Sequence, residues 1–215
     1  MGELLKLFLI NQRIRFCWMA LLDEQYWTER YQKGNIGWDI GYPSTPIKEY
    51  VDQLEDKSVK ILIPGVGNAY EAEYLWKMGF ENITIIDLSV LPLQKFSKRM
   101  PDFPKSRLVH QDFFYHDDQY DLIIEQTFFC ALNPKLRASY LKKMTELLKP
   151  RGKLVGLLFN LPLNEDQPPF GGRKEEYLLL FNQFLQVNKM EEAYNSIPPR
   201  LGNELWIDIS LKSEF

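Results

Sequence analysis

The stretch that most constrains this chain is residues 60–75, KILIPGVGNAYEAEYL. It predicts a buried strand, a glycine turn and a helix, because residues 61–63 form an unbroken apolar run like those of strands covered on both faces. Gly65 and Gly67 allow a sharp turn and a close approach of a ligand to the backbone. A second apolar strand ends in Asp87, twenty residues beyond Gly67. A carboxylate at that place accepts hydrogen bonds from ribose hydroxyls, so the pair indicates an adenosine-containing ligand.

The glycine turn departs from the dinucleotide fingerprint G-x-G-x-x-G in two ways. Tyr70 stands at the last glycine position and is too large for the close helix–strand packing that a glycine allows there, and Pro64 precedes the first glycine. S-adenosylmethionine (SAM) has no pyrophosphate, so its site needs room for a methionine tail instead of a helix end against phosphates. The turn therefore favours SAM, with a nicotinamide or flavin site and a purely structural turn as alternatives.

Composition sets the broad class. A length of 215 residues with 45% hydrophobic content suits one domain with a real core. The net charge of −3 gives no electrostatic footprint for nucleic acid, so no nucleic-acid partner is expected. Cys17 and Cys130 make no metal-ligand spacing, no metal is expected, and a reducing cytoplasm is the expected location. A monomer is favoured.

The N-terminal residues 1–24 are apolar and basic, and we interpret them as a helical extension preceding a single domain at 25–215. A signal peptide is the first alternative, but polar residues 11–13 interrupt the apolar region and no A-x-A site follows. A membrane-surface helix is the second. No apolar run reaches the roughly 18 residues that span a bilayer, so no stable membrane insertion is expected.

Strand-like and helix-like segments alternate along the rest of the chain. Strands are expected at 61–63, 82–87, 107–114, 120–125, 153–159, 190–194 and 204–211, and helices at 46–54, 71–78, 89–100, 134–148 and 174–184. This order predicts an α/β fold, a parallel sheet with helices on both faces. Gly65, Asp87, Asp112 and Glu125-Gln126 all stand at predicted strand C-terminal ends. Ligands bind at that edge of such sheets, so these residues predict one shared site.

Further motifs follow one another from about residue 26 to the C-terminus. They are Trp27-x-x-x-Tyr31, Gly37-Trp38-Asp39-x-Gly41, Ile63-Pro64-Gly65-Val66-Gly67, Asp112-Phe113-Phe114, Phe128-Phe129-Cys130-Ala131-Leu132-Asn133-Pro134, Pro168-Pro169-Phe170 and Ile197-Pro198-Pro199-Arg200. Together they resemble the thiopurine methyltransferase-like family of class I SAM-dependent enzymes, which also contains halide and thiol methyltransferases. The resemblance implies a Rossmann-like class I SAM-dependent methyltransferase fold, with a mostly parallel seven-stranded sheet whose last strand is antiparallel.

The resemblance also implies a set of cofactor-binding residues. Aromatic residues of the N-terminal segment would close over SAM, the glycines would border its methionine part, Asp87 would bind the ribose, Asp112 and Phe113 the adenine, and Gln126 would line the wall near the sulfonium. Aromatic faces suit this cofactor because they attract cations. The complete expected set is Trp27, Tyr31, Trp38, Gly65, Gly67, Asp87, Leu88, Asp112, Phe113 and Gln126. Three departures concern the halide/thiol branch, which has tryptophan at Tyr31, more glycine at Asn68-Ala69 and a tyrosine near the acceptor at Phe170.

The expected activity is methyl transfer from SAM by in-line displacement to a small soft nucleophile such as a thiol, thiopurine, halide or selenol. Arg200 is the candidate catalytic residue that steers an anionic acceptor, with a solvated loop arginine as its alternative. His110 and His116 are candidate bases, although His116 fits a solvated turn, and Cys130 is expected to be a buried packing residue. A nicotinamide-dependent oxidoreductase and a SAM-binding module without catalysis are the alternative functions.

Overall fold

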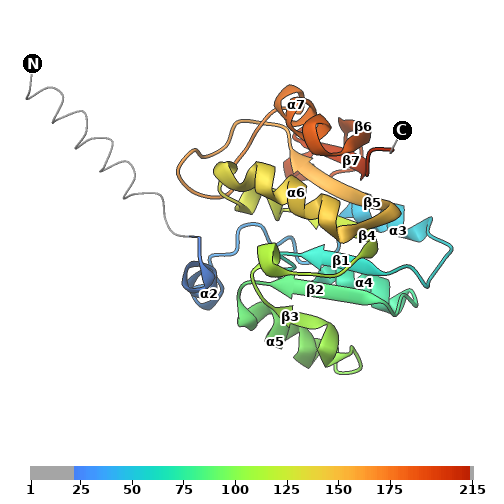
Figure 1. Ribbon diagram of the computed structural model, residues 1–215. Helices are drawn as coiled ribbons and strands as arrows, with labels where there is room; N and C mark the ends of the chain where they lie inside the picture. The colour runs from blue at the N-terminus through green and yellow to red at the C-terminus, as the bar shows by residue number, and fades with distance from the viewer. Residues whose placement is uncertain (1–21, 214–215) are drawn as a thin grey trace, which may run out of the picture.

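A seven-stranded sheet in the order β3-β2-β1-β4-β5-β7-β6 forms the centre of the computed structural model, which describes residues 22–213 (Figure 1). The strands are β1 (Ile61–Pro64), β2 (Ile83–Asp87), β3 (Leu108–His110), β4 (Tyr120–Gln126), β5 (Leu148–Phe159), β6 (Gln186–Glu192) and β7 (Glu204–Ser210). All pairs are parallel except the two that involve β7, which runs antiparallel to β5 and β6. The expected mostly parallel sheet with an antiparallel last strand is confirmed.

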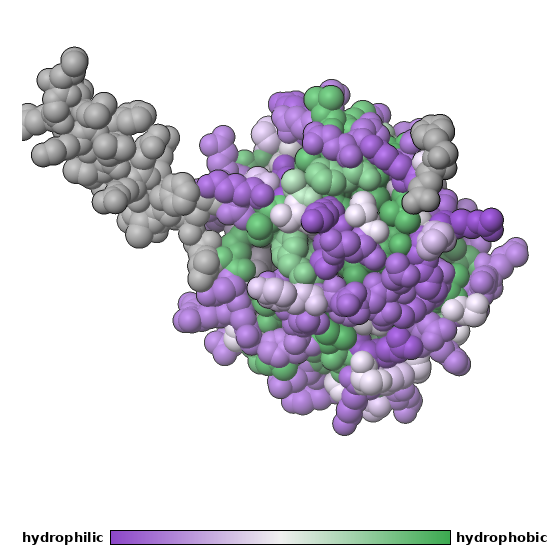
Figure 2. Space-filling model, in the orientation of Figure 1, coloured by the Kyte–Doolittle hydropathy of each residue, from purple (hydrophilic) through white to green (hydrophobic). Residues whose placement is uncertain are grey.

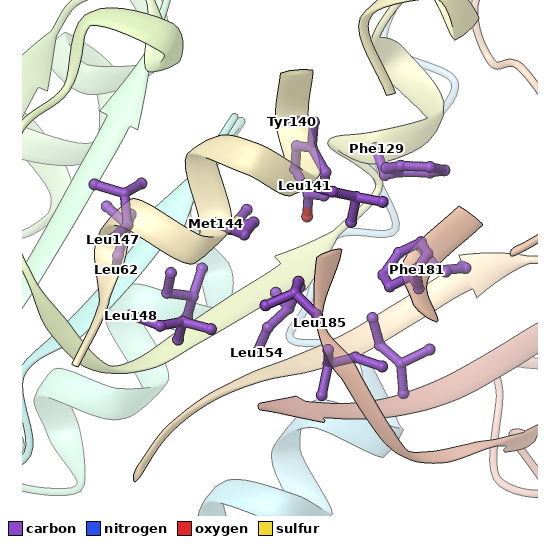
Figure 3. Packing of buried hydrophobic residues seen from close by; sticks show 14 of the residues in the cluster. Leu62, Phe129, Tyr140, Leu141, Met144, Leu147, Leu148, Leu154, Phe181 and Leu185 are labelled. Carbon is purple, nitrogen blue, oxygen red and sulfur yellow. The ribbon is translucent and has the colours of Figure 1, made fainter. Parts of the chain in front are cut away.

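Helices cover both faces of this sheet, as the alternating sequence pattern predicted. They are α2 (Glu24–Gln32), α3 (Thr45–Asp52), α4 (Tyr70–Lys77), α5 (Val90–Arg99), α6 (Arg137–Leu147) and α7 (Lys174–Phe184). Successive strand residues point to opposite faces. Leu62 therefore packs with the core of α6 and α7, whereas Ile61 and Ile63 pack with residues of α3, α4 and α5. Figure 3 shows the first of these cores, and Figure 2 shows the mostly hydrophilic surface around it.

Several element boundaries differ from the sequence expectation: β6 begins at Gln186 instead of Met190, α6 begins at Arg137 after a 3₁₀ turn at Pro134–Leu136, and two others have a clear cause. The strand expected at 107–114 is β3, which ends at His110, because the Asp112 carboxylate accepts a hydrogen bond from Phe114 N (3.0 Å) and caps the short 3₁₀ helix Phe113–Tyr115. Such local side-chain bonds compete with strand pairing. At the other boundary β5 begins at Leu148 instead of Lys153, since Leu148 pairs with Tyr120 before a register shift.

The expected extension at residues 1–24 falls mainly outside the described part of the chain. The described part begins at residue 22, and the Asp23 carboxylate accepts a hydrogen bond from Tyr26 N (2.9 Å), which caps α2. The helix α2 therefore begins at Glu24, and the expected domain boundary at residue 25 stays a prediction. No helix within residues 22–213 is long and apolar enough to cross a membrane.

Candidate functional site

A cavity of about 580 Å³ opens at the carboxyl ends of the parallel strands. Gly65 lies after β1, Asp87 ends β2, Asp112 follows β3 and Thr127 follows β4, and all of them line the same cavity. Its volume falls within the roughly 300–1,000 Å³ usual for ligand pockets. The strand ends that the sequence predicted to form one site therefore share one hollow.

The structure brings together all but two of the residues expected at this site. Those that line the cavity are Trp27, Tyr31, Trp38, Gly65, Asp87, Leu88, Asp112, Phe113 and Arg200. Gly67 and Gln126 do not line it. Gly67 is covered by protein, because a Cβ there would stand 3.6 Å from Trp38 Nε1 and 3.7 Å from the Tyr31 hydroxyl oxygen. The Oε1 of Gln126 is buried and has no hydrogen-bond partner among residues 22–213.

Asp87 is held by the glycine turn and by the start of α5. Gly67 N donates to Asp87 Oδ2 (3.2 Å) and Ser89 N donates to Oδ1 (2.8 Å). The Tyr31 hydroxyl faces the same carboxylate from α2. Asp87 is only 6% exposed, and burial raises its pKa to about 6 in spite of these donors. Each carboxylate oxygen keeps lone-pair capacity for a hydroxyl donor from a ligand.

Gly65 is required by a contact that the sequence did not predict. Its φ is +57°, and an added Cβ would stand 2.2 Å from Phe128 Cδ2. The glycines were expected to allow the close approach of a ligand, but the group that lies against Gly65 is a side chain of the protein, Phe128. Phe128 lines the cavity beside Gly65 and links the turn after β1 to the loop after β4.

Aromatic rings from α2 and the following loop form one wall of the cavity. The Trp27 and Trp38 ring centroids lie 5.6 Å apart and those of Tyr31 and Trp38 lie 5.7 Å apart, both in edge-to-face geometry. Trp27 and Tyr31 share a helical face because they are four residues apart. Arg30 lies on the same side of α2 and lines the cavity, although it was not among the expected site residues. Its i+3 spacing from Trp27 is the signal that could have found it.

The loop after β4 is anchored by Glu125, which is fully buried. Phe128 N and Phe129 N both donate to Glu125 Oε1 (2.8 Å each), and the Tyr140 hydroxyl donates to Oε2 (2.7 Å). Figure 3 shows Tyr140 projecting from α6 with its hydroxyl toward the sheet. Burial raises the pKa of Glu125 to about 7. Glu125 does not line the cavity, so this strand-end acid positions the loop that does.

A second part of the cavity lining is largely apolar, and Arg200 lies between it and Trp38. Apolar residues on this wall include Leu132, Phe159, Leu161, Leu163, Pro168 and Pro169. Arg200 donates to Glu204 Oε1 (3.3 Å) and to the Trp38 carbonyl (2.9 Å), and its side chain is only 11% exposed. It is therefore a buried, paired cation and not a solvated loop arginine. Phe170 is buried in the core and does not line the cavity.

Neither histidine lines the cavity. His110 Nε2 lies 2.9 Å from Glu24 Oε1 at the surface. The expectation that His116 lies in a solvated turn is wrong, because its ring is 8% exposed and its Nε2 lies 2.7 Å from the Tyr120 hydroxyl. Cys130 is buried, as expected, and its thiol donates to the Thr127 carbonyl (3.2 Å) while burial raises its pKa. Within residues 22–213 no group of His, Cys, Asp and Glu side chains is arranged to hold a metal ion.

Comparison with known proteins agrees with this geometry. A family model described as thiopurine S-methyltransferase (TPMT) matches residues 22–207. The chain belongs to the thiopurine S-methyltransferase family. This assignment makes it a SAM-dependent methyltransferase, and the nicotinamide alternative is set aside. Tyr70 agrees with this result, since it begins α4 at the position where a dinucleotide fold has its last glycine.

Relatives similar to this chain include plant and bacterial enzymes. The chain is 28% identical over 185 residues to probable thiol methyltransferase 2 of Arabidopsis thaliana, covering 83% of this chain and 81% of the relative. It is 28% identical to thiocyanate methyltransferase 1 of Brassica oleracea, with 85% and 83% covered. Identity to thiopurine S-methyltransferase of Acinetobacter baylyi is 22%, with 86% and 98% covered.

Solved structures share the fold at lower identity. The 1,6-didemethyltoxoflavin-N1-methyltransferase of Burkholderia thailandensis, solved with 1,6-didemethyltoxoflavin and S-adenosylhomocysteine, superimposes with a TM-score of 0.74 at 15% identity, covering 91% of this chain and 89% of that one. A TehB-like SAM-dependent methyltransferase from Corynebacterium glutamicum gives a TM-score of 0.61 at 20% identity, with 88% and 98% covered. The Rossmann-like methyltransferase fold is therefore confirmed.

Proposed function

We propose that this methyltransferase methylates a small soft nucleophile of the thiol type that enters the cavity as an anion. The observation that carries the proposal is the chemistry of the acceptor wall. Among the described residues that line the cavity there is no histidine, burial keeps the Cys130 thiol protonated by raising its pKa, and the carboxylates of Asp87 and Asp112 are assigned below to the cofactor. A thiolate needs no general base, whereas an alcohol or amine must lose a proton. The names of the relatives, which refer to thiols, thiocyanate and thiopurine, support the same class.

The residues around the cavity suit SAM as the donor. SAM supplies a methyl group activated by a positive sulfonium. We assign the aromatic wall of Trp27, Tyr31 and Trp38 to the cationic end of SAM, because π faces attract cations and exclude water. We assign Asp87 to the ribose hydroxyls, with Leu88 beside it, and Asp112 and Phe113 to the adenine. Gly65 and Gly67 would border the methionine part, and Gln126 remains a predicted neighbour of the sulfonium.

The apolar wall favours the reaction between a cation and an anion. Displacement brings opposite charges together, so a site without bulk water makes it easier than it is in solution. Phe159, Leu161 and Pro168 would exclude water from the acceptor, and Arg200 would attract its negative charge from the edge of this wall. Because Glu204 already pairs with Arg200, it partly cancels the positive charge that Arg200 presents to the acceptor.

The role of Arg200 predicts the behaviour of a double variant. In Arg200→Gln/Glu204→Gln both buried charges are removed together, so neither is left unpaired. We expect the KM for a thiolate acceptor to rise about tenfold, as for loss of a contact to a charged group, while the affinity for SAM is retained. Steady-state kinetics and calorimetry measure the two quantities. Glu204→Gln alone keeps the cation and serves as control, and an unchanged KM in the double variant would remove Arg200 from acceptor binding.

An acceptor panel tests the function itself. Purified protein with methyl-labelled SAM is offered bisulfide, 6-mercaptopurine, iodide and a selenol in parallel. We expect labelled product on at least one sulfur acceptor, rising with pH as the thiol ionises. Tight SAM binding without turnover on any member of the panel would favour the alternative of a SAM-binding module without catalysis.

We also propose a cytoplasmic location and a monomeric enzyme whose partners are small molecules. Cys130 is a free, buried thiol, consistent with a reducing compartment. The net charge of −3 argues against a nucleic-acid acceptor. Size-exclusion chromatography with light scattering tests the oligomeric state.

A further inference from the structure

Arg30 is a cation on the cavity wall for which residues 22–213 supply no charged partner. Among residues 22–213 it forms no ion pair, and its buried Nε has no hydrogen-bond partner. Arg200, the other arginine on the wall, is paired with Glu204 and with the Trp38 carbonyl. Burying an arginine nitrogen without an acceptor is unfavourable. An anionic group of a ligand would supply the missing acceptor and charge.

Stacking holds the Arg30 guanidinium in one orientation. Its central carbon lies 5.4 Å from the Trp38 ring centroid and 5.8 Å from that of Tyr26. Trp38 belongs to the aromatic wall, and Tyr26 supports that wall from behind by packing edge to face against Trp27 at 5.1 Å. A guanidinium stacked on rings keeps its N–H groups directed along its edge, where they can bind a carboxylate in bidentate fashion.

The position of Arg30 identifies which end of the cavity receives this anion. The Trp38 ring that Arg30 stacks on also touches the Tyr31 ring and reaches Gly67 of the glycine turn. Arg200, in contrast, packs over Phe159 on the apolar wall, 5.4 Å from the ring centroid. Arg30 thus lies on the ring of Trp38 beside the glycine turn, whereas Arg200 lies between the Trp38 carbonyl and the Phe159 ring and is already paired.

We propose that Arg30 binds the carboxylate of the methionine part of SAM. This inference rests on the proposed assignment of the glycine turn to the methionine part of the cofactor. SAM carries one carboxylate, at the far end of its amino-acid tail, and Arg30 offers the charge and the planar donor pair that match it. The aromatic wall would then do two things at once, because the indole that faces the cofactor also orients the arginine that binds its carboxylate.

The test compares two ligands that differ only in the amino-acid tail. S-adenosylhomocysteine has the carboxylate, and 5′-methylthioadenosine lacks the whole tail beyond the methylthio group. Calorimetry measures both dissociation constants for the wild type, for Arg30→Gln and for the control Lys33→Gln. Lys33 caps the same helix but is exposed and paired with Glu29, so its replacement removes one charge without touching the cavity.

We expect Arg30→Gln to raise the dissociation constant of S-adenosylhomocysteine roughly 10- to 100-fold, the usual effect of losing a charge-assisted pair. The dissociation constant of 5′-methylthioadenosine should be unchanged. Lys33→Gln should change neither. An equal loss for both ligands would overturn the proposal and show that Arg30 supports the aromatic wall. An unchanged S-adenosylhomocysteine affinity with a raised acceptor KM would overturn it in favour of acceptor binding. Failure of the wild type to methylate any thiol would refute the proposed acceptor class while leaving this binding result intact.

Discussion

Replacing Asp87 with alanine is expected to weaken SAM binding at least 100-fold, because two hydrogen bonds to a buried carboxylate contribute roughly 1.5–3 kcal/mol each. The carboxylate can accept from both ribose hydroxyls while Gly67 N and Ser89 N hold it in place. Its loss also frees Gly67 N and removes the group that the Tyr31 hydroxyl faces. Calorimetric titration with SAM measures the effect, and thermal unfolding of the free variant checks that the fold is retained.

The pH dependence of binding follows from the same carboxylate. Because burial raises the pKa of Asp87 to about 6, the ionised form dominates above that pH and the protonated form below it. A protonated carboxyl loses acceptor strength, so SAM affinity should fall as the pH drops through about 6. Asp87→Asn cannot titrate, and its weaker affinity should stay flat over this range. A wild-type affinity that is constant from pH 5 to pH 8, a window bracketing that pKa, would show that Asp87 does not bind the ribose.

The parts of the site that sequence could predict are those encoded by neighbouring residues. A strand, a glycine turn and an acid at the next strand end lie within one short stretch, so Gly65 and Asp87 could be placed together before any fold was known. The strand boundaries were harder to predict, because local side-chain hydrogen bonds compete with strand pairing. The Asp112 carboxylate accepts a hydrogen bond from Phe114 N and so ends the extended segment that the apolar run predicted.

Other features of the site depend on contacts between distant segments. Phe128 meets Gly65, and Arg30 stacks on Trp38. Arg30 has a local signal in its i+3 spacing from Trp27, whereas the Phe128–Gly65 contact leaves no local pattern in the sequence, because the pairing of β1 with β4 brings the two loops together. The same holds for His116, whose acidic neighbours in sequence suggested a solvated turn but whose ring packs against Tyr120. Long-range packing overrides composition at such positions.

A substitution at Glu125 should strongly reduce stability. Glu125→Ala removes the acceptor of Phe128 N, Phe129 N and the Tyr140 hydroxyl, three buried donors. Unsatisfied buried groups are unfavourable by about 1–3 kcal/mol each, so for three of them we expect a loss of about 3–9 kcal/mol in the free energy of unfolding. Urea denaturation followed by tryptophan fluorescence measures it. SAM binding should weaken as well, because the loop that Glu125 holds lines the cavity.

Glu125→Gln separates the hydrogen bonds from the charge. Its Oε1 still accepts from both backbone N–H groups, and the Tyr140 hydroxyl can turn to accept from the new amide. Burial raises the Glu125 pKa from 4.5 to about 7, so the folded state favours the protonated carboxyl. Stability of the wild type should therefore fall as pH rises from 4.5 through 7, by about 3 kcal/mol, and the glutamine variant should lack this fall. At pH 8, above that pKa, we expect Glu125→Gln to be at least as stable as the wild type. A variant as unstable there as Glu125→Ala would mean that the loop requires the negative charge itself.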